Sequence, residues 1–226
     1  MGFPELKYYR FDGACTIVGH ALLLQYDIPF ESVIVKVTPD GIEPVDGSLT
    51  SAEYREKLST MGTIPVLAVD GVALSENPAV LTYIASLTPA GESLTGGEDS
   101  RQHAQVLSWV AWFSSIVHGR VFTMLFRASK FVSDEKQQPD TQEKGRVVIR
   151  RCFAKINEHL ADRKYLVGDM VTIADYYAIV FYLWGNKHAF GPMEKKYPNY
   201  GKLFKLLQQL KGVQAALENE SQLQYC

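Results

Sequence analysis

Cysteine is scarce in this sequence. Three cysteines occur in 226 residues, at wide spacing, and no two of them form a Cys-x-x-Cys pair. This excludes disulfide exchange by a two-cysteine route and leaves no framework of disulfides to hold a small secreted fold. An odd number of isolated thiols is typical of a reducing compartment. We therefore expect a cytoplasmic protein without structural disulfides.

Long apolar runs and an excess of charge of one sign are also missing. No stretch approaches the ~20 apolar residues that a membrane-spanning helix needs, and the N-terminus has no signal-peptide core. Basic and acidic residues number 23 and 25, which excludes the concentrated positive face of a nucleic-acid-binding protein. The five histidines show no metal-ligand spacing. We expect no membrane, no nucleic acid and no metal as a partner.

The composition that is present, 46% hydrophobic and 21% charged residues, is that of an ordinary globular protein of one or two domains. The clearest pattern in it is a hairpin. Asp70-Gly71 separates two short apolar runs, Val66–Val69 and Val72–Leu74. Gly accepts the positive φ of a tight turn, so an Asp-Gly pair in this setting predicts antiparallel strands.

A helix is predicted directly after this hairpin, and its start has the chemistry of a small-ligand site. Asn77 can cap the helix, and Pro78 suits its first turn. The unpaired N–H groups of a helix start attract a carboxylate, while the preceding acid, Glu76, can hold an ammonium group. Ile64-Pro65, ahead of the hairpin, is either the ordinary start of an edge strand or a cis peptide that would turn the backbone of Ile64 outward.

The first third of the chain predicts a βαβ unit. A strand, a helix of about ten residues and a second strand rich in β-branched residues follow one another, and a right-handed crossover between them implies parallel pairing. A turn-rich connector of greater than usual length then leads to the hairpin. The predicted order is strand Leu6–Tyr9, helix from Cys15 or Thr16 to Tyr26, strand Glu31–Val37, connector Thr38–Thr50 and short helix Ser51–Ser59.

The second half of the chain predicts helices only. Residues 88–100 are rich in Gly and acids and nearly free of apolar residues, which indicates a boundary between domains. Thr172 and Asp175 are spaced to form a capping box at the start of one of the later helices. The predicted helices are 101–130, 142–163, 173–190 and 199–210. The sequence therefore predicts an α/β domain at 1–88, a linker at 89–100 and an all-α helical bundle at 101–226.

These features resemble the glutathione S-transferase superfamily, over the range from Leu6 to about Leu217. The Ile-Pro-Val-Leu strand, the hairpin, the Ser-Glu-Asn turn and the Ala-Val-x-x-Tyr-Ile helix are similar to its glutathione-binding half. The run Leu166–Asp175 is similar to the capping and staple motif of its helical half. The resemblance implies a thioredoxin-like domain followed by an all-helical domain, in a homodimer.

The resemblance also implies how glutathione is held. Pro65 would be cis, and Ile64 before it would pair with the cysteinyl backbone of the tripeptide. Glu76 and Asn77 would bind its γ-glutamyl end. Asn77 departs from the family pattern, in which this turn usually reads Ser-Glu-Ser or Thr-Glu-Gly.

The thiol of glutathione must ionise near neutral pH to be a useful nucleophile, which calls for a hydrogen-bond donor beside the sulfur. Four side chains compete for this role: Tyr8 and Tyr9 at the end of the first strand, and Cys15 and Thr16 at the start of the first helix. Tyr8 matches the first aromatic residue of the Tyr-Phe-x-x-x-Gly motif in the tyrosine-type classes. The run from Gly13 to Thr16, Gly-Ala-Cys-Thr, is more similar to the Gly-Ala-Cys-Ser of the bacterial beta class, in which the cysteine lies beside glutathione. We rank Cys15 first, followed by Thr16 and Tyr8.

Further beta-class likeness lies in the helical half. The pattern Ser-Trp-x-x-Trp-Phe-x-Ser-x-x-His ends at His118, and Trp184 follows later, although Gly119 stands where that class has lysine. Each candidate also has a purely structural interpretation: Cys15 can be an inert small hydrophobic residue, and a buried Trp184 can belong to the core.

The resemblance implies an enzyme that activates glutathione, as co-substrate, for attack on a small apolar electrophile. Two alternatives stay open. One is a glutathione-dependent cis-trans double-bond isomerase in a specialised biosynthetic pathway, with glutathione as cofactor, although the Ser-Ser-Cys motif of the maleylacetoacetate isomerases is absent at residues 13–15. The other is a non-catalytic glutathione-binding or interaction module. The sequence does not identify the second substrate.

Overall fold

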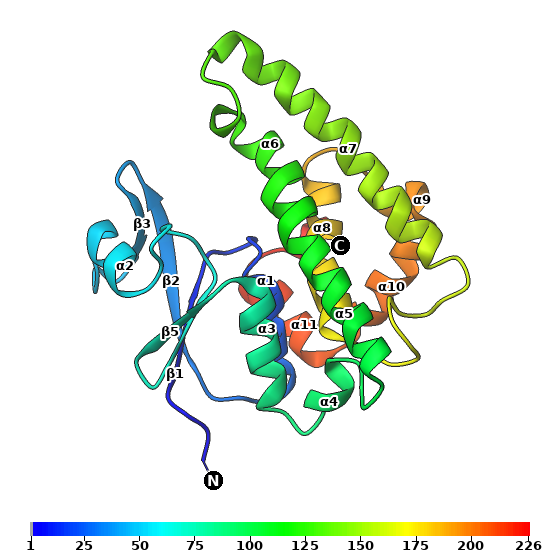
Figure 1. The fold of residues 1–226 in the computed structure, drawn as a ribbon, viewed down its shortest axis with the longest axis horizontal. Helices are drawn as coiled ribbons and strands as arrows, with labels where there is room; N and C mark the ends of the chain where they lie inside the picture. The colour runs from blue at the N-terminus through cyan, green and yellow to red at the C-terminus, as the bar shows by residue number, and fades with distance from the viewer. Residues whose placement is uncertain (1) are drawn as a thin grey trace.

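The computed structural model describes residues 2–226 (Figure 1). Its first part is a mixed sheet of five strands in the order β3-β2-β1-β4-β5. Helices α1 and α3 lie between this sheet and the helical second part, while α2 covers the opposite face. The elements of the first part are β1 (Leu6–Arg10), α1 (Ile17–Gln25), β2 (Glu31–Thr38), β3 (Gly41–Pro44), α2 (Ser51–Lys57), β4 (Val66–Val69), β5 (Val72–Ser75) and α3 (Asn77–Ser86).

Strand pairing in the sheet confirms the predicted βαβ unit and the predicted hairpin. β1 runs parallel to β2, as the βαβ pattern requires, and antiparallel to β4. β4 and β5 form the predicted hairpin, with Asp70 and Gly71 at φ of 48° and 82°. Both values lie in the left-handed region, which Gly and Asp tolerate better than most residues. The pattern does not predict β3, a four-residue edge strand that ends at Pro44, where an edge position allows proline.

The second part is entirely helical, and α8 is its centre. Thirteen of the fifteen residues of α8 are buried, because this helix is packed on nearly all sides. Its start confirms the predicted role of Asp175, whose carboxylate accepts hydrogen bonds from the backbone N–H and the hydroxyl of Thr172. The helices of this part are α4 (Gly91–Leu94), α5 (Ser100–Trp112), a π-helical segment (Phe113–Phe122), α6 (Thr123–Phe126), α7 (Gln138–His159), α8 (Ile173–Lys187), α9 (Met193–Lys196), α10 (Pro198–Gln208) and α11 (Lys211–Asn219).

The helix predicted from residue 101 to 130 is not a regular α-helix throughout. α5 continues without a break into the π-helical segment, and α6 follows it. A π-helix joins each N–H to the carbonyl five residues earlier, so its turns are wider than those of an α-helix. Gly119 lies in this segment, and a Cβ at that position would be 2.9 Å from the carbonyl oxygen of Ser114. Apolar spacing also places Leu107 among the residues expected to be buried on this helix, but Leu107 is exposed.

The main apolar core is continuous through both parts of the molecule. It extends from β1 and α1 through α3 into the helices around α8. α1 joins the two parts, because it packs against β1 on one side and against α11 and α8 on the other. The loop of residues 11–16, which precedes α1, is therefore held between the sheet and the helical part. No helix within residues 2–226 is long and apolar enough to cross a membrane.

Candidate functional site

Cys15 lies where three segments of the chain meet. It ends the loop between β1 and α1, and it is only 3% exposed. Its Sγ is 3.7 Å from the carbonyl oxygen of Ile64, and its own carbonyl accepts a hydrogen bond of 3.3 Å from Nδ2 of Asn77. The structure thus brings Cys15, Ile64 and Asn77, which are far apart in the sequence, into one cluster.

Burial determines the charge state of Cys15. The loss of solvent raises the pKa of its thiol to about 12, and the side chain of Asn77 opposes this only in part. At neutral pH the group is therefore a protonated thiol. A protonated thiol is a poor nucleophile, but it can donate a hydrogen bond to a neighbouring anion.

The start of α3 differs from the prediction at Asn77. Glu76, not Asn77, is the cap residue, with a φ of 72°, and its side chain is exposed. Asn77 is the first residue of the helix, and its side chain is 3% exposed and turned toward Cys15. Its Oδ1 has no hydrogen-bond partner within residues 2–226. The prediction fails here because the amide of Asn77 donates to the carbonyl of Cys15, in the loop before α1, and does not cap the N–H groups of its own helix.

The peptide bond between Ile64 and Pro65 is cis, as the resemblance implies and as base rates alone would not suggest. Pro65 is buried just before β4, while Ile64 is half-buried. The carbonyl of Ile64 points at the thiol of Cys15. This bend in the backbone therefore forms one wall of the space beside Cys15.

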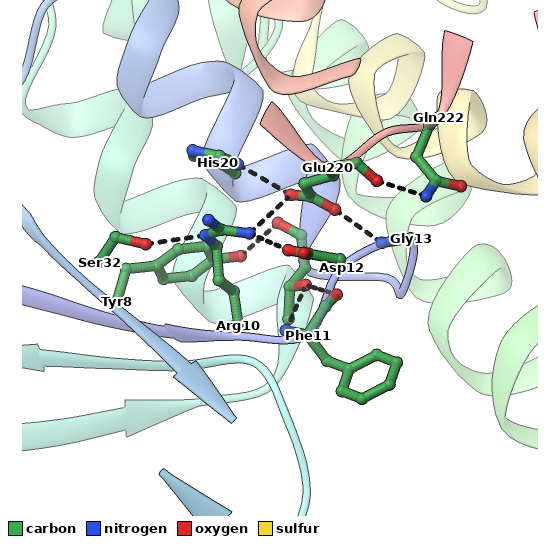
Figure 2. A network of polar contacts seen from close by, with 10 residues as sticks. Tyr8, Arg10, Phe11, Asp12, Gly13, His20, Ser32, Glu220 and Gln222 are labelled. Carbon is green, nitrogen blue, oxygen red and sulfur yellow. Dashed lines mark hydrogen bonds and ion pairs between the residues drawn. The ribbon is translucent and has the colours of Figure 1, made fainter. Parts of the chain in front are cut away.

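Tyr8 and Thr16 lie at the same loop, but both hydroxyl groups already have hydrogen-bond partners in its backbone (Figure 2). The hydroxyl of Tyr8 donates to the backbone carbonyl of Thr16 at 2.7 Å, and the ring is fully buried. A Cβ on Gly19 would be 2.5 Å from this hydroxyl, so glycine at that position lets α1 pack against the ring. Thr16 donates to the carbonyl of Phe11 at 3.0 Å and accepts from its N–H at 3.2 Å.

The pKa of Tyr8 is raised well above its ordinary value, because burial disfavours the phenolate. Tyr9, the next residue of β1, faces the other side of the sheet and packs against Tyr54 of α2. Of the three predicted catalytic residues, Cys15 is the one that lines the adjoining cavity.

That cavity has a volume of about 240 Å³ and lies between the two parts of the molecule. Cys15 and Ile64 contribute to one wall, and His118, Phe126 and Trp184 of the helical part contribute to the other. The indole N–H of Trp184 donates to the carbonyl of Gly13 at 2.9 Å, which ties this wall to the loop. Burial, with a smaller contribution from the charge of Arg127, lowers the pKa of His118 to about 4. His118 is therefore neutral at neutral pH.

A buried polar cluster on the other side of the loop was not predicted from the sequence (Figure 2). Glu220, which follows α11, is 1% exposed. One carboxylate oxygen is 2.8 Å from Nδ1 of His20 and 3.8 Å from the guanidinium of Arg10, and the other accepts from the N–H of Gly13 at 2.8 Å. The side chain of Gln222 lies over the same glycine.

The guanidinium of Arg10 is shared between three partners. Its Nε donates to the hydroxyl of Ser32 on β2 at 2.8 Å, and the group also contacts Asp12 and Glu220. The sequence holds a weak signal of this cluster, since His20 stands within an apolar helix and a buried ring nitrogen needs a partner. Nothing in the pattern indicates that the partner lies 200 residues away.

The fold and the site together define a protein with a thioredoxin-like first part, a helical second part and a cysteine-lined cavity between them. Residues 116–210 match the family model described as the glutathione S-transferase C-terminal domain. The curated glutathione S-transferase GST-4.5 of Xanthomonas campestris pv. campestris is 30% identical over 182 residues, which cover 80% of this chain and 83% of the relative.

Solved structures agree with this match. A bacterial beta class glutathione S-transferase of Sphingomonas chungbukensis has a TM-score of 0.78 and 25% identity, over 96% of this chain and 100% of the other. A sphingomonad glutathione S-transferase complexed with glutathione has a TM-score of 0.78 and 26% identity, over 95% and 98%. The chain belongs to the glutathione S-transferase family. Within the family it is similar to the bacterial beta class.

Proposed function

We propose that this protein is a glutathione transferase that activates the thiol of glutathione for attack on a small apolar electrophile. One observation carries the proposal. The thiol of Cys15, the backbone of Ile64 and the aromatic wall of the helical part all line one cavity, with the start of α3 next to it. Such an arrangement suits a reaction between a peptide-like thiol and an apolar partner.

Glutathione would be held by groups of the first part. The exposed carboxylate of Glu76 suits the ammonium of the γ-glutamyl residue, and the N–H groups at the start of α3 suit its carboxylate. The backbone of Ile64, turned by the cis bond to Pro65, suits the cysteinyl backbone. The unpartnered Oδ1 of Asn77 is a further buried acceptor within this site.

Cys15 would act as a hydrogen-bond donor to the sulfur of glutathione. Its raised pKa keeps the proton on Cys15, so the thiol stabilises a neighbouring thiolate instead of competing with it as a nucleophile. The proton of the glutathione thiol leaves to solvent, the thiolate sulfur forms a bond to the electrophilic carbon, and the leaving group departs with its electron pair. Tyr8 and Thr16 would position Cys15 by holding the loop.

Two relatives also support the binding and use of glutathione. The relative from Xanthomonas is named a glutathione S-transferase, and the sphingomonad neighbour is described as complexed with glutathione. We extend both properties to this chain. We also propose that it works as a cytoplasmic homodimer, and that its two domains span 1–88 and 101–226 with a linker between them.

The first test is the ultraviolet difference spectrum on addition of glutathione near neutral pH, with S-methyl glutathione as the control. A thiolate band with glutathione alone supports both binding and activation. Product mass then separates conjugation, in which glutathione replaces the leaving group, from isomerisation, which leaves the substrate mass unchanged. Binding without a thiolate band would favour a non-catalytic binding module.

A further inference from the structure

We infer that Arg127 selects electrophiles that carry an anionic group, such as an aromatic carboxylate, and binds that group at the mouth of the cavity. The inference rests on the proposed function, because it names the class of second substrate. It is carried by the position of Arg127, by the charges around it and by the shape of the wall beside it.

The backbone of Arg127 is held by hydrogen bonds on both sides. Arg127 directly follows α6, and its N–H donates to the carbonyl of Thr123 at 2.8 Å. Its carbonyl accepts from the N–H of Lys130 at 3.0 Å, at the start of the next turn. The side chain lines the same cavity as Cys15 and His118. The fold therefore fixes the backbone from which this exposed side chain extends along the cavity wall.

The charge of Arg127 is not compensated. No carboxylate among residues 2–226 comes within 4.0 Å of its guanidinium, and no acidic side chain lines the cavity. Burial is the main cause of the low pKa of His118, and the positive charge of Arg127, on the same cavity wall, is the second. Because Arg127 is exposed, its attraction for an anion is that of one unpaired charge that solvent and salt partly screen.

The wall next to Arg127 favours a flat ring. Trp184 lies edge-on to Phe126, with ring centroids 5.2 Å apart, and edge-on to His118 at 5.3 Å. These rings offer apolar faces and edges against which an aromatic electrophile can pack. A guanidinium binds a carboxylate with two parallel hydrogen bonds. The two features together fit an aromatic ring that bears a carboxylate.

Two other uses of Arg127 give different results in the test. The residue stands at the end of α6, where a cation interacts favourably with the carbonyl groups of a helix terminus. That role would stabilise the fold without any preference for substrate charge. Alternatively, Arg127 could bind the glycyl carboxylate of glutathione, which would alter the KM for glutathione and not the choice of electrophile.

The binding test does not depend on turnover. Nitrobenzoate and nitrobenzamide have nearly the same shape and differ in charge, and both quench tryptophan fluorescence at close range. We expect the wild-type protein to bind nitrobenzoate about fivefold to tenfold more tightly than nitrobenzamide, as one charge-assisted pair at a partly open site permits. The preference should disappear in Arg127→Ala and weaken as salt is added.

The kinetic test uses the reactive counterparts, chloronitrobenzoate and chloronitrobenzamide, at saturating glutathione. Arg127→Ala should lower kcat/KM for the benzoate about fivefold to tenfold, with less than a twofold change for the benzamide and in the KM for glutathione. Comparing each variant with the wild type on the same substrate removes the intrinsic difference in reactivity. Arg120→Ala is the matched control, since Arg120 lies on the same helical stretch, is exposed and does not line the cavity.

The outcomes separate the possibilities. Equal losses on both substrates, or an unchanged preference in the binding test, would overturn the inference. A rise in the KM for glutathione alone would assign Arg127 to the tripeptide and also overturn it. If no product forms and no thiolate band appears, the proposed function fails, while the ratio of the two binding constants still decides whether Arg127 recognises an anion.

Discussion

At the scale of single residues, Cys15 is a buried thiol that also lines the cavity. The same burial that raises its pKa to about 12 leaves it protonated. Its Sγ lies 3.7 Å from the carbonyl oxygen of Ile64, and the amide of Asn77 holds its backbone carbonyl. On the proposed function, the thiol would act through its proton. Substitutions that keep or remove this proton therefore test its role directly.

Replacing Cys15 by alanine should lower kcat/KM for conjugation by about 10- to 100-fold, because one hydrogen bond to the thiolate is lost. Cys15→Ser keeps a donor and should retain most of the activity. Steady-state kinetics and spectroscopic titration of bound glutathione measure the effect, with Cys152→Ala, at another buried thiol, as the control. Full activity in Cys15→Ala together with loss of activity in Tyr8→Phe would transfer the donor role to Tyr8.

His118 should make the stability of the protein depend on pH. Burial lowers its pKa to about 4 from 6.5, so between these values the unfolded chain binds a proton that the folded protein does not. Stability is then fully present above pH 6.5 and falls as pH decreases toward 4. Urea unfolding at pH 4.5 and 7 should show a fall that is about 1–2 kcal/mol smaller in His118→Gln. His103→Gln, at an exposed histidine, should match the wild type, and an identical fall in all three proteins would contradict this account.

The residues that the sequence could predict are those with a local signature. Glu76 and Pro65 stand at a helix start and a strand start, so pattern and resemblance together predict a role for them in binding glutathione. The side-chain direction of Asn77 is different, because a cap residue and a first-turn residue have the same sequence signature. Only the packing of α3 against the loop of α1 decides between them.

At the scale of elements, the π-helical segment between α5 and α6 explains one departure from the beta-class pattern. A Cβ on Gly119 would lie 2.9 Å from the carbonyl oxygen of Ser114, which leaves no room for a side-chain atom. A lysine at this position would therefore require a different backbone. The segment also carries His118, so its geometry sets where this ring enters the cavity wall.

Substituting Gly119 by alanine should destabilise the protein by about 1–2 kcal/mol, since the added methyl group contacts backbone that cannot move away. In an ordinary α-helix interior the same change stabilises by roughly 1 kcal/mol, so the sign of the effect is diagnostic. Chemical denaturation measures it. A more stable Gly119→Ala variant would mean that this segment adopts regular α-helical geometry in solution.

Elements with strong periodicity were predicted well, and those fixed by distant contacts were not. Asp70-Gly71 determines its hairpin locally, and Asp175 determines the start of α8 within a few residues. β3 has only four residues, with glycine and proline at its ends, and it exists because β2 offers an edge to pair with. The π-helical segment was not predicted, because the apolar-spacing templates used for the sequence separate helix from strand and include no i→i+5 pattern.

At the scale of the whole molecule, Glu220 joins the two parts. Its carboxylate lies against Arg10, Gly13 and His20, which belong to β1, the loop and α1. The loop that positions Cys15 is therefore held on one side by the sheet and on the other by the segment after α11. The groups in this contact are polar and buried, so removing one of them leaves the others without a partner and costs folding free energy.

Glu220→Ala should destabilise the protein by about 3 kcal/mol, because the ring of His20 and the N–H of Gly13 lose their partner and the buried guanidinium of Arg10 loses one of its three. The variant should also lower kcat/KM, since the loop that carries Cys15 loses its support. Denaturant unfolding and hydrogen exchange at Gly13 measure the two effects. Glu218→Ala, at an exposed acid two residues earlier, should change neither. A double-mutant cycle with His20→Ala should give a coupling of about 0.5–3 kcal/mol, and strict additivity would argue against this contact.

The bond between Gly13 and Glu220 spans 207 residues and has a consequence for the order in which the protein is made. The ribosome delivers the thioredoxin-like part first, and domains generally fold as units during synthesis. The strands and α3 can form early, but the loop that carries Cys15 cannot acquire its carboxylate until the segment after α11 has been translated. The sheet of the nascent chain can thus be complete while its thiol-bearing loop is still unsupported.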